Sequence, residues 1–119
     1  MDELRDRMRI IQELVPGKQI TIAHIIANPD EVLYQKLGLD PAAEHSGAIG
    51  IVTMSPSETA IIAGDIAIKT SGAELGFVDR FSGTLIVTGT VSQVEEALSA
   101  VCGYCENKLG FSVCDITKT

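Results

Sequence analysis

Hydrophobic and polar positions follow two periods along this chain, and one stretch near its middle combines both. Residues 48–54 are apolar and partly β-branched, and a run this short predicts a strand that is covered on both faces. Helical signals follow at once. Ser55 stands at an N-cap position, Pro56 at the first helical position, and Glu58 at the spacing of a capping box. Gly72 is placed to end this helix in a left-handed conformation.

The predicted helix carries two apolar faces. One follows the i, i+3, i+4, i+7 spacing of a core-facing stripe. Its members are Thr59, Ile62, Ala63, Ile66, Ala67 and Thr70. Ile61 and Ile68 lie off this stripe. Because a single small domain offers only one core, the second apolar face indicates contact with a partner subunit.

A strand and a short helix are predicted before this unit. Residues 19–27 alternate as a strand, and one face of it would carry Ile20, Ile22, His24 and Ile26. Asn28 and Pro29 then form a helix start, with Asn28 as the N-cap. Gly38 ends this short helix, and residues 39–47 resemble a linker.

Two strands and a helix are predicted after the central unit. Residues 74–81 and 84–90 read as a hairpin with a tight turn at Ser82-Gly83. Ser92 is the expected cap of the next helix, with Glu95 completing a second capping box. The apolar stripe of that helix comprises Val94, Ala97, Leu98, Val101, Cys102, Cys105 and Leu109.

The order of these elements predicts the fold class. Gly110 ends the last helix, and residues 111–117 read as a final strand. Residues 48–117 therefore spell β-α-β-β-α-β, the pattern of an α/β domain with a ferredoxin-like core. The strand at 19–27 and the short helix after it then stand as additions to that core.

The N-terminal segment is different in character. The first nine residues are mostly charged, which is typical of a tail. A short strand follows, with Ile10, Gln12 and Leu14 on one face and Ile11, Glu13 and Val15 on the other, so that both faces carry apolar residues. A strand of this kind at the edge of a domain needs a partner for its backbone groups. We therefore divide the chain into residues 1–18, a tail and strand, and residues 19–119, the domain.

Composition and charge narrow the function classes. The 119 residues suffice for one domain, and 45% of them are hydrophobic. A mean hydropathy of +0.25 favours assembly. Nine Lys and Arg against 16 Asp and Glu give a net charge of −7, which argues against nucleic-acid binding. Since no apolar run reaches the ~18 residues of a membrane span and the N-terminus lacks an apolar signal segment, we expect a cytosolic protein.

The cysteines and histidines offer candidate chemistry. Cys102 and Cys105 form a Cys-X-X-Cys, but late in a helix and on its apolar stripe, so core packing is the favoured interpretation for them and for Cys114. Three cysteines in a cytosolic chain do not indicate a disulfide framework. His24 and His45 lack a ligand spacing to the cysteines, so we predict no metal.

Two charged pairs have alternative interpretations. Asp79-Arg80 on the predicted hairpin could bind an anion or pair within an interface. Asp65 and Lys69 have the i, i+4 spacing of a helix-surface ion pair.

His24 lies among isoleucines, which favours a structural histidine over a catalytic base. No phosphate loop, nucleophile elbow or dinucleotide fingerprint is found, so no catalytic residue or cofactor is predicted.

Successive blocks of the chain resemble bacterial microcompartment shell domains. The blocks are Ala48 to Met54, Asp65 to Lys69, Gly76 to Gly83 and Val91 to Leu98. In the ordinary shell domain a strand ending in a His-Ile-Ile-Ala-Arg-Pro-like motif comes last, whereas the similar Thr21 to Pro29 comes early here. The chain thus resembles a circularly permuted shell protein. Its segment Ile10 to Gln19 resembles that of permuted shell proteins of ethanolamine and propanediol utilisation.

The resemblance implies a cyclic homohexamer that tiles into a protein shell. It assigns Arg80, Phe81, Ser82 and Gly83 to the lining of the central pore. The strand carrying Ile10, Gln12 and Leu14 would form a β-barrel with its symmetry mates and cap that pore. Lys69 and Asn28 match positions at the hexamer edge, although the ordinary motif has Arg where this chain has Asn28.

The resemblance therefore implies a structural, non-enzymatic shell subunit in the cytoplasm. Its partners would be its own copies, other microcompartment shell proteins and encapsulated enzymes, with no nucleic acid and no membrane. Ethanolamine, propanediol and choline degradation all remain open as the enclosed pathway. A small-molecule-binding regulatory domain is the alternative, since ferredoxin-like folds also serve that role. An enzyme using Cys or His is the least favoured class.

Overall fold

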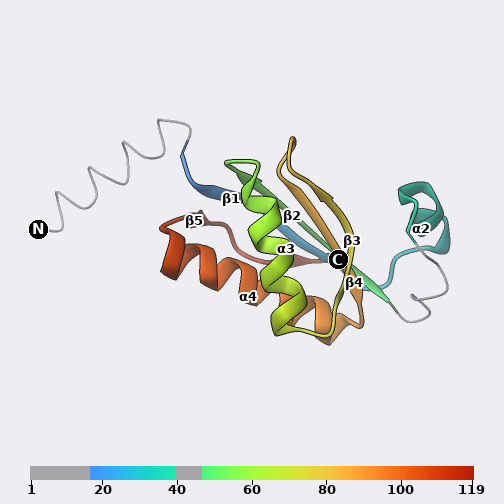
Figure 1. The fold of residues 1–119 in the computed structure, drawn as a ribbon. Coiled ribbons are helices and arrows are strands. Elements are labelled where there is room, and N and C mark those ends of the chain that lie inside the picture. Colours follow the sequence, from blue (N-terminus) through green and yellow to red (C-terminus); the bar gives the residue numbers. More distant parts are fainter. Residues whose placement is uncertain (1–16, 40–46) are drawn as a thin grey trace, which may run out of the picture.

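A computed structural model describes residues 17–39 and 47–119, which form one sheet and three helices (Figure 1). Helices α3 and α4 lie side by side on one face of the sheet, and α2 lies apart from them at one end. The elements in chain order are β1 Gln19–Ile26, α2 Glu31–Leu37, β2 Ala48–Ser55, α3 Thr59–Thr70, β3 Glu74–Asp79, β4 Thr84–Gly89, α4 Val91–Leu109, β5 Ser112–Val113 and β6 Thr117–Lys118. No helix in these two ranges is long and apolar enough to cross a membrane.

The sheet has the strand order β3-β4-β2-β1-β5, with β6 pairing further along β1. The α/β fold with a ferredoxin-like element order is therefore confirmed, but β1 is no addition to it. β1 pairs antiparallel with the whole of β2, from Gln19 opposite Ser55 to Ile26 opposite Ile49. β2 therefore has β4 on one side and β1 on the other, and residues 111–117 do not form the predicted full strand. They pair parallel to β1 only through the two-residue strands β5 and β6.

Small residues on α3 form its contact with the sheet, which corrects the predicted stripe. The buried positions are Thr59, Ala60, Ala63, Gly64 and Ala67. Ile62 is 46% exposed and Thr70 is exposed as well. Small side chains let the helix approach the sheet closely: a Cβ built on Gly64 would lie 3.5 Å from side-chain carbons of Leu75 and Val78. Ile61, Ile62 and Ile68 are thereby turned outward, whereas Ile66 packs against the core.

Both predicted ends of α3 are wrong. Ser55 is the last residue of β2, and the helix is preceded by Glu58, whose side chain makes no capping hydrogen bond. Turns take over that role, since the amide of Thr59 donates to the carbonyl of Pro56 at 3.0 Å. At the other end the cap is Ser71, which is extended, so Gly72 does not stop the helix in a left-handed conformation.

The other helix starts are also shifted, whereas their ends are confirmed. Asp30, not Asn28, caps α2, and its carboxylate accepts from the amide of Val32 at 2.9 Å. Thr90 and Gln93, not Ser92 and Glu95, form the capping box of α4. The cap of α2 lies two residues after the predicted one, and the cap of α4 lies two residues before it. Gly38 and Gly110 end α2 and α4 with φ of +71° and +73°.

An irregularity near the start of β1 changes which residues face the core. The register with β2 shifts between Ile20 and Ile22. Such a bulge inserts one residue and flips the alternation that follows. Ile20, Ala23 and Ile25 are therefore the buried set, and Ile22 is half exposed. The predicted shared face of Ile20 with Ile22 is wrong for this reason.

The core has two parts. Between the sheet and α3 and α4 lies the main cluster, which includes Leu85, Leu98 and Val101, and the predicted stripe of α4 is buried in it. A smaller cluster on the opposite face joins Tyr34 of α2 to Ile49 and Ile86. Together they fix α2 at one end of the sheet and the β3–β4 hairpin at an edge.

Candidate functional site

The turn between β3 and β4 contains the four residues that were predicted to line a pore: Arg80, Phe81, Ser82 and Gly83. It is longer than the two-residue turn predicted, because β3 already ends at Asp79. The amide of Gly83 donates to the carbonyl of Asp79 at 2.9 Å and closes the loop. Sequence reasoning thus located the turn and its residues, but not its length.

Asp79 organises this turn through its side chain. One carboxylate oxygen accepts from the amide of Phe81 and the other from the hydroxyl of Ser82, both at 2.8 Å. These hydrogen bonds, that of Phe81 first, lower the pKa of the Asp79 carboxyl from its ordinary value. Asp79 is therefore engaged within the turn rather than in an ion pair with Arg80. An Asp two residues before an exposed amide is the signal of such an Asx-turn.

Gly83 fixes the turn against the end of β2. Its φ is +75°, and its carbonyl accepts from the amide of Met54 at 2.8 Å. A Cβ at this position would lie 2.2 Å from the carbonyl oxygen of Met54 and 3.0 Å from the Cα of Ser57. Only glycine fits here, both in conformation and in space.

Arg80 and Phe81 project from the turn. Phe81 is 80% exposed, and the Arg80 guanidinium carbon lies 4.9 Å from the centre of its ring, a cation–π distance. A hollow of about 350 Å³ beside them is lined by Ile61, Val78, Asp79, Arg80 and Phe81. The tip therefore presents a cation and an aromatic ring next to a recess of mixed polar and apolar lining.

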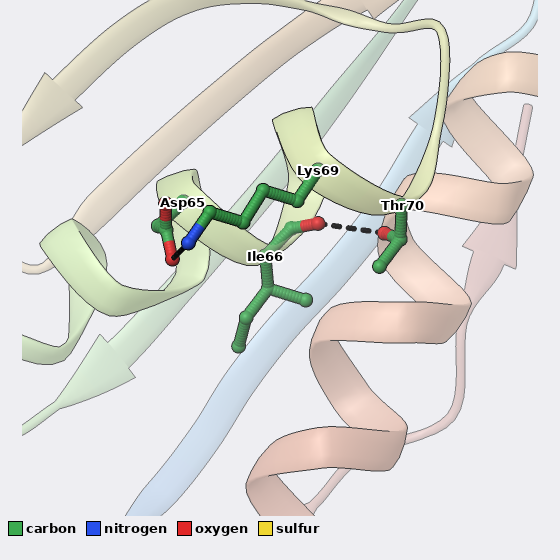
Figure 2. Close-up of polar contacts among 4 residues, drawn as sticks. All are labelled: Asp65, Ile66, Lys69 and Thr70. Atoms are coloured by element: carbon green, nitrogen blue, oxygen red, sulfur yellow. Dashed lines mark hydrogen bonds and ion pairs between the residues drawn. The ribbon is translucent and has the colours of Figure 1, made fainter.

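Lys69 lies in the last turn of α3 and forms the predicted pair with Asp65. Its Nζ is 3.0 Å from Asp65 Oδ2, and both side chains are largely exposed (Figure 2). Asn28, the second predicted edge residue, is exposed in the segment between β1 and α2. Lys69 and Asn28 thus come from different elements, and no hydrogen bond or ion pair described within residues 17–39 and 47–119 joins them.

The free edge of the sheet exposes apolar side chains that sequence reasoning missed. β3 is the terminal strand of the sheet, and its Leu75 and Phe77 are nearly half exposed. Beside it, the outward isoleucines of α3 are equally exposed. Apolar residues in a strand look the same in the sequence whether a core or another protein covers them, so the sequence carries no signal for this exposure. An apolar edge of this kind is typical of a surface that meets another protein.

The cysteines show no sign of reactivity. Burial raises the pKa of the Cys102 thiol to about 11 and also raises that of Cys105. Cys114 is half buried, and all three thiols are free. Within residues 17–39 and 47–119 no cluster of three His, Cys, Asp or Glu side chains has a metal-binding arrangement.

His24 is engaged in the way expected of a structural histidine. Its Nδ1 lies 2.6 Å from Thr117 Oγ1, and its Nε2 lies 3.0 Å from Thr119 Oγ1. It therefore ties the C-terminal strand β6 to β1. His45 and the strand residues Ile10, Gln12 and Leu14 lie outside the described residues.

Comparison with known proteins decides the family. The family model of the BMC domain matches residues 48–116. The chain is 51% identical over 114 residues to the bacterial microcompartment shell protein EutS of Escherichia coli (strain K12), covering 96% of this chain and 99% of that protein. The chain belongs to the BMC-domain family. It is also 50% identical, over its full length and 99% of the relative, to the bacterial microcompartment shell protein CutR of Streptococcus intermedius.

Two further comparisons extend this membership. The microcompartment shell protein PduU of Salmonella typhimurium is 52% identical, with 93% of both chains covered. Among solved structures, a CutR flat hexamer matches with a TM-score of 0.82 at 48% identity, covering 88% of this chain and 94% of that one. The family resemblance and the predicted α/β shell-domain fold are thereby confirmed, while the predicted barrel strand lies outside the described residues.

Proposed function

We propose that this chain is a structural shell subunit of a bacterial microcompartment and acts as a cyclic homohexamer. One observation carries the proposal: the chain aligns over nearly its whole length with shell proteins, one of them solved as a flat hexamer with the same fold. Its partners are its own copies, other shell proteins and the enclosed enzymes, and its location is the shell within the cytoplasm. With a net charge of −7, neither nucleic acid nor membrane is a proposed partner.

The apolar edge supports ring formation. Leu75 and Phe77 on β3 are nearly half exposed in the single subunit. Burying a fully exposed Leu or Phe side chain is worth about 1.5–3 kcal/mol, so covering the exposed half of each would stabilise an assembly by about 1 kcal/mol. A ring gives every copy the same two contacts, so each edge strand would be covered and none left over.

In this ring the turn Arg80 to Gly83 would surround the axis. The rigidity of the turn, held by Asp79 and Gly83, supports such a role because it fixes where Arg80 and Phe81 project. Residues 1–18 would add the strand of Ile10, Gln12 and Leu14 to a barrel over this opening. Residues 19–119 would form the shell domain, with Lys69 and Asn28 at its rim.

The barrel is tested by deleting residues 1–15 from the full chain. All strands of the described sheet, β1 to β6, come after the deleted residues. The truncated protein should therefore keep its ring and lose only the cover of the axis. Cryo-electron microscopy of both proteins would compare density on the axis. A truncated protein that runs as a monomer would contradict this division of labour.

A structural rather than catalytic role is supported by the state of the candidate nucleophiles. The thiol of Cys102 has a pKa of about 11, which leaves almost no thiolate at neutral pH. Both ring nitrogens of His24 lie within hydrogen-bond distance of threonine hydroxyls. Neither group is poised as a nucleophile or base.

Negative-stain electron microscopy of the purified full chain tests the proposal. Rings that associate into sheets or tubes are expected. Dispersed particles without ring symmetry at micromolar concentration would overturn it, and would favour the regulatory-domain alternative.

A further inference from the structure

The three cysteines lie in one part of the core, although they come from two different elements. Cys102 and Cys105 occupy the buried stripe of α4. After α4 the chain turns back and runs beside this helix to residue 119 (Figure 1). Cys114 lies on this returning segment, is half-buried, and packs against the main core cluster that contains both other thiols. No single thiol here is set up as a reactive cysteine, but the three are gathered where two of them can react with each other.

Cys102 is the partner that the structure gives to Cys114. Burial, and after it a negative charge on Cys114, raise the pKa of the Cys102 thiol, and a like charge has this effect only from nearby. The pKa of Cys105 is raised by burial alone. Nor can Cys102 pair with Cys105 without distorting α4. Side chains three positions apart on a helix have Cβ atoms about 5–6 Å apart, whereas a disulfide needs about 3.5–4.5 Å.

The segment that carries Cys114 is held at both ends and unpaired between them. We call residues 112–119 the C-terminal strap. At one end of it β5 pairs with the start of β1, and near the other end β6 pairs with the last residues of β1. Residues 114–116 belong to neither strand. The middle of the strap can therefore shift without breaking the pairs of β5 and β6, which is the freedom that a disulfide needs to reach its geometry.

We propose that Cys102 and Cys114 form a redox-sensitive pair, and that their disulfide clamps the C-terminal strap to α4. The oxidant is a hydroperoxide. The Cys114 thiolate attacks one peroxide oxygen, the O–O bond breaks, and hydroxide leaves, so that Cys114 becomes a sulfenic acid. The Cys102 thiolate then attacks the Cys114 sulfur, and the oxygen leaves as hydroxide while the S–S bond forms. The two thiol protons and the two hydroxides make two molecules of water, and two electrons pass from the thiols to one peroxide.

The order of these steps follows from exposure. Cys114 is half-buried and meets the oxidant first, whereas Cys102 is only 7% exposed. As a single group Cys102 is inert, because its thiol pKa is about 11. Oxidation of Cys114 removes its negative charge, which is one cause of that raised pKa. The two sulfurs are also held together by the fold and need no encounter in solution. Cys102 therefore reacts only after Cys114 has been oxidised.

The clamp goes beyond the proposed function and does not depend on ring formation, because both thiols belong to one subunit. In a reducing cytosol the pair stays as two thiols, and exposure to peroxide closes it. The strap covers the edge of β1 that faces away from β2. A covalent link from the strap to α4 should therefore hold this edge of the sheet closed under oxidising conditions.

Peroxide treatment of the purified full chain, followed by alkylation of the remaining thiols, tests the pair. Non-reducing peptide mapping by mass spectrometry should show a peptide that joins Cys102 to Cys114, with Cys105 alkylated. Cys105→Ala is the matched control and should form the same link as the unaltered chain. Cys102→Ala and Cys114→Ala should form no link. A melting curve of each reduced variant shows whether it has folded.

Thermal unfolding of the oxidised and the reduced chain tests the clamp itself. The link should raise the melting temperature by about 5 °C or more, and dithiothreitol should reverse this shift. An unchanged melting temperature would exclude the clamp. The pairing would be overturned by a Cys102–Cys105 link, by a Cys114–Cys114 link between two copies, or by three thiols that stay free. Oxidation of Cys114 to a sulfinic acid without any link would overturn it as well. Because each readout concerns bonds within one chain, failure of the ring would overturn the proposed function and leave this inference standing.

Discussion

Replacing Gly83 with alanine adds one methyl group to the turn that we propose surrounds the pore. The backbone there has φ of +75°, and an alanine in this left-handed region is strained by about 1–2 kcal/mol. The new Cβ would also lie 2.2 Å from the Met54 carbonyl oxygen, which is closer than real Cβ contacts come. The turn must move away, and the hydrogen bond from the Met54 amide to the Gly83 carbonyl, worth about 1 kcal/mol, is lost with that movement. We expect Gly83→Ala to destabilise the fold by about 2–4 kcal/mol.

Gly110 provides the matched control. Its φ of +73° is nearly the same, but a Cβ there meets nothing within 4 Å. Gly110→Ala should therefore show the conformational strain alone, about 1–2 kcal/mol. Urea unfolding at equal protein concentration compares the two, because an assembly's stability depends on concentration. Equal losses in the two variants would refute the crowding argument for Gly83.

Three further predictions concern a glycine and a cysteine of α4 and the aspartate of the β3–β4 turn. Gly103→Ala, in the middle of α4 with no atom within 4 Å of the new Cβ, should raise the unfolding free energy by about 0.5–1 kcal/mol, and a lower urea midpoint would contradict this. The folded-state pKa of Asp79 lies below its unfolded value, so its stabilisation is present at neutral pH and is lost as pH falls below about 4. The melting temperatures of the unaltered chain and Asp79→Asn should therefore converge from pH 7 to pH 3, and a constant gap would exclude this role. With a thiol pKa of about 11, Cys102 should react at pH 8 with a thiolate-specific reagent roughly a hundredfold more slowly than in the urea-unfolded chain. Peptide mapping after labelling measures this rate, and equally rapid labelling of the folded chain would contradict the raised pKa.

Helix α4 and helix α3 show what the sequence could and could not predict. The stripe of α4, from Val94 to Cys105, is both predicted and buried, because large apolar residues recur there at a single helical spacing. On α3 large isoleucines occur on several sides, and burial is decided instead by Ala60 and Gly64, which let the helix approach β3. Small residues carry almost no hydrophobic signal, so periodicity placed Thr59, Ala63 and Ala67 correctly but included the exposed Ile62 and Thr70 and missed Ala60 and Gly64.

The predictions of the helix caps and of the role of β1 were wrong for other reasons. Ser92 satisfies the pattern of a cap, but so does Thr90, which is the residue that caps α4. Ser55 remains in β2, and α3 begins at Thr59 without a side-chain cap. The bulge between Ile20 and Ile22 inverts an alternation that looks regular in the sequence. β1 takes its place beside β2 through long-range pairing, which no local pattern records.

The candidate site was partly predictable. Arg80 to Gly83 could be located from the family resemblance and the turn signal, while the role of Asp79 needed the hydrogen bonds to Phe81 and Ser82. The pairing of Lys69 with Asp65 followed from spacing alone. Its place between exposed isoleucines depends on which side of α3 is buried, and so it required the structure.

Native mass spectrometry of the purified chain at micromolar concentration tests the central claim most directly. The account predicts one dominant species with the mass of a hexamer of the 12.6-kDa chain. A protein that is chiefly monomeric or dimeric under these conditions would contradict it.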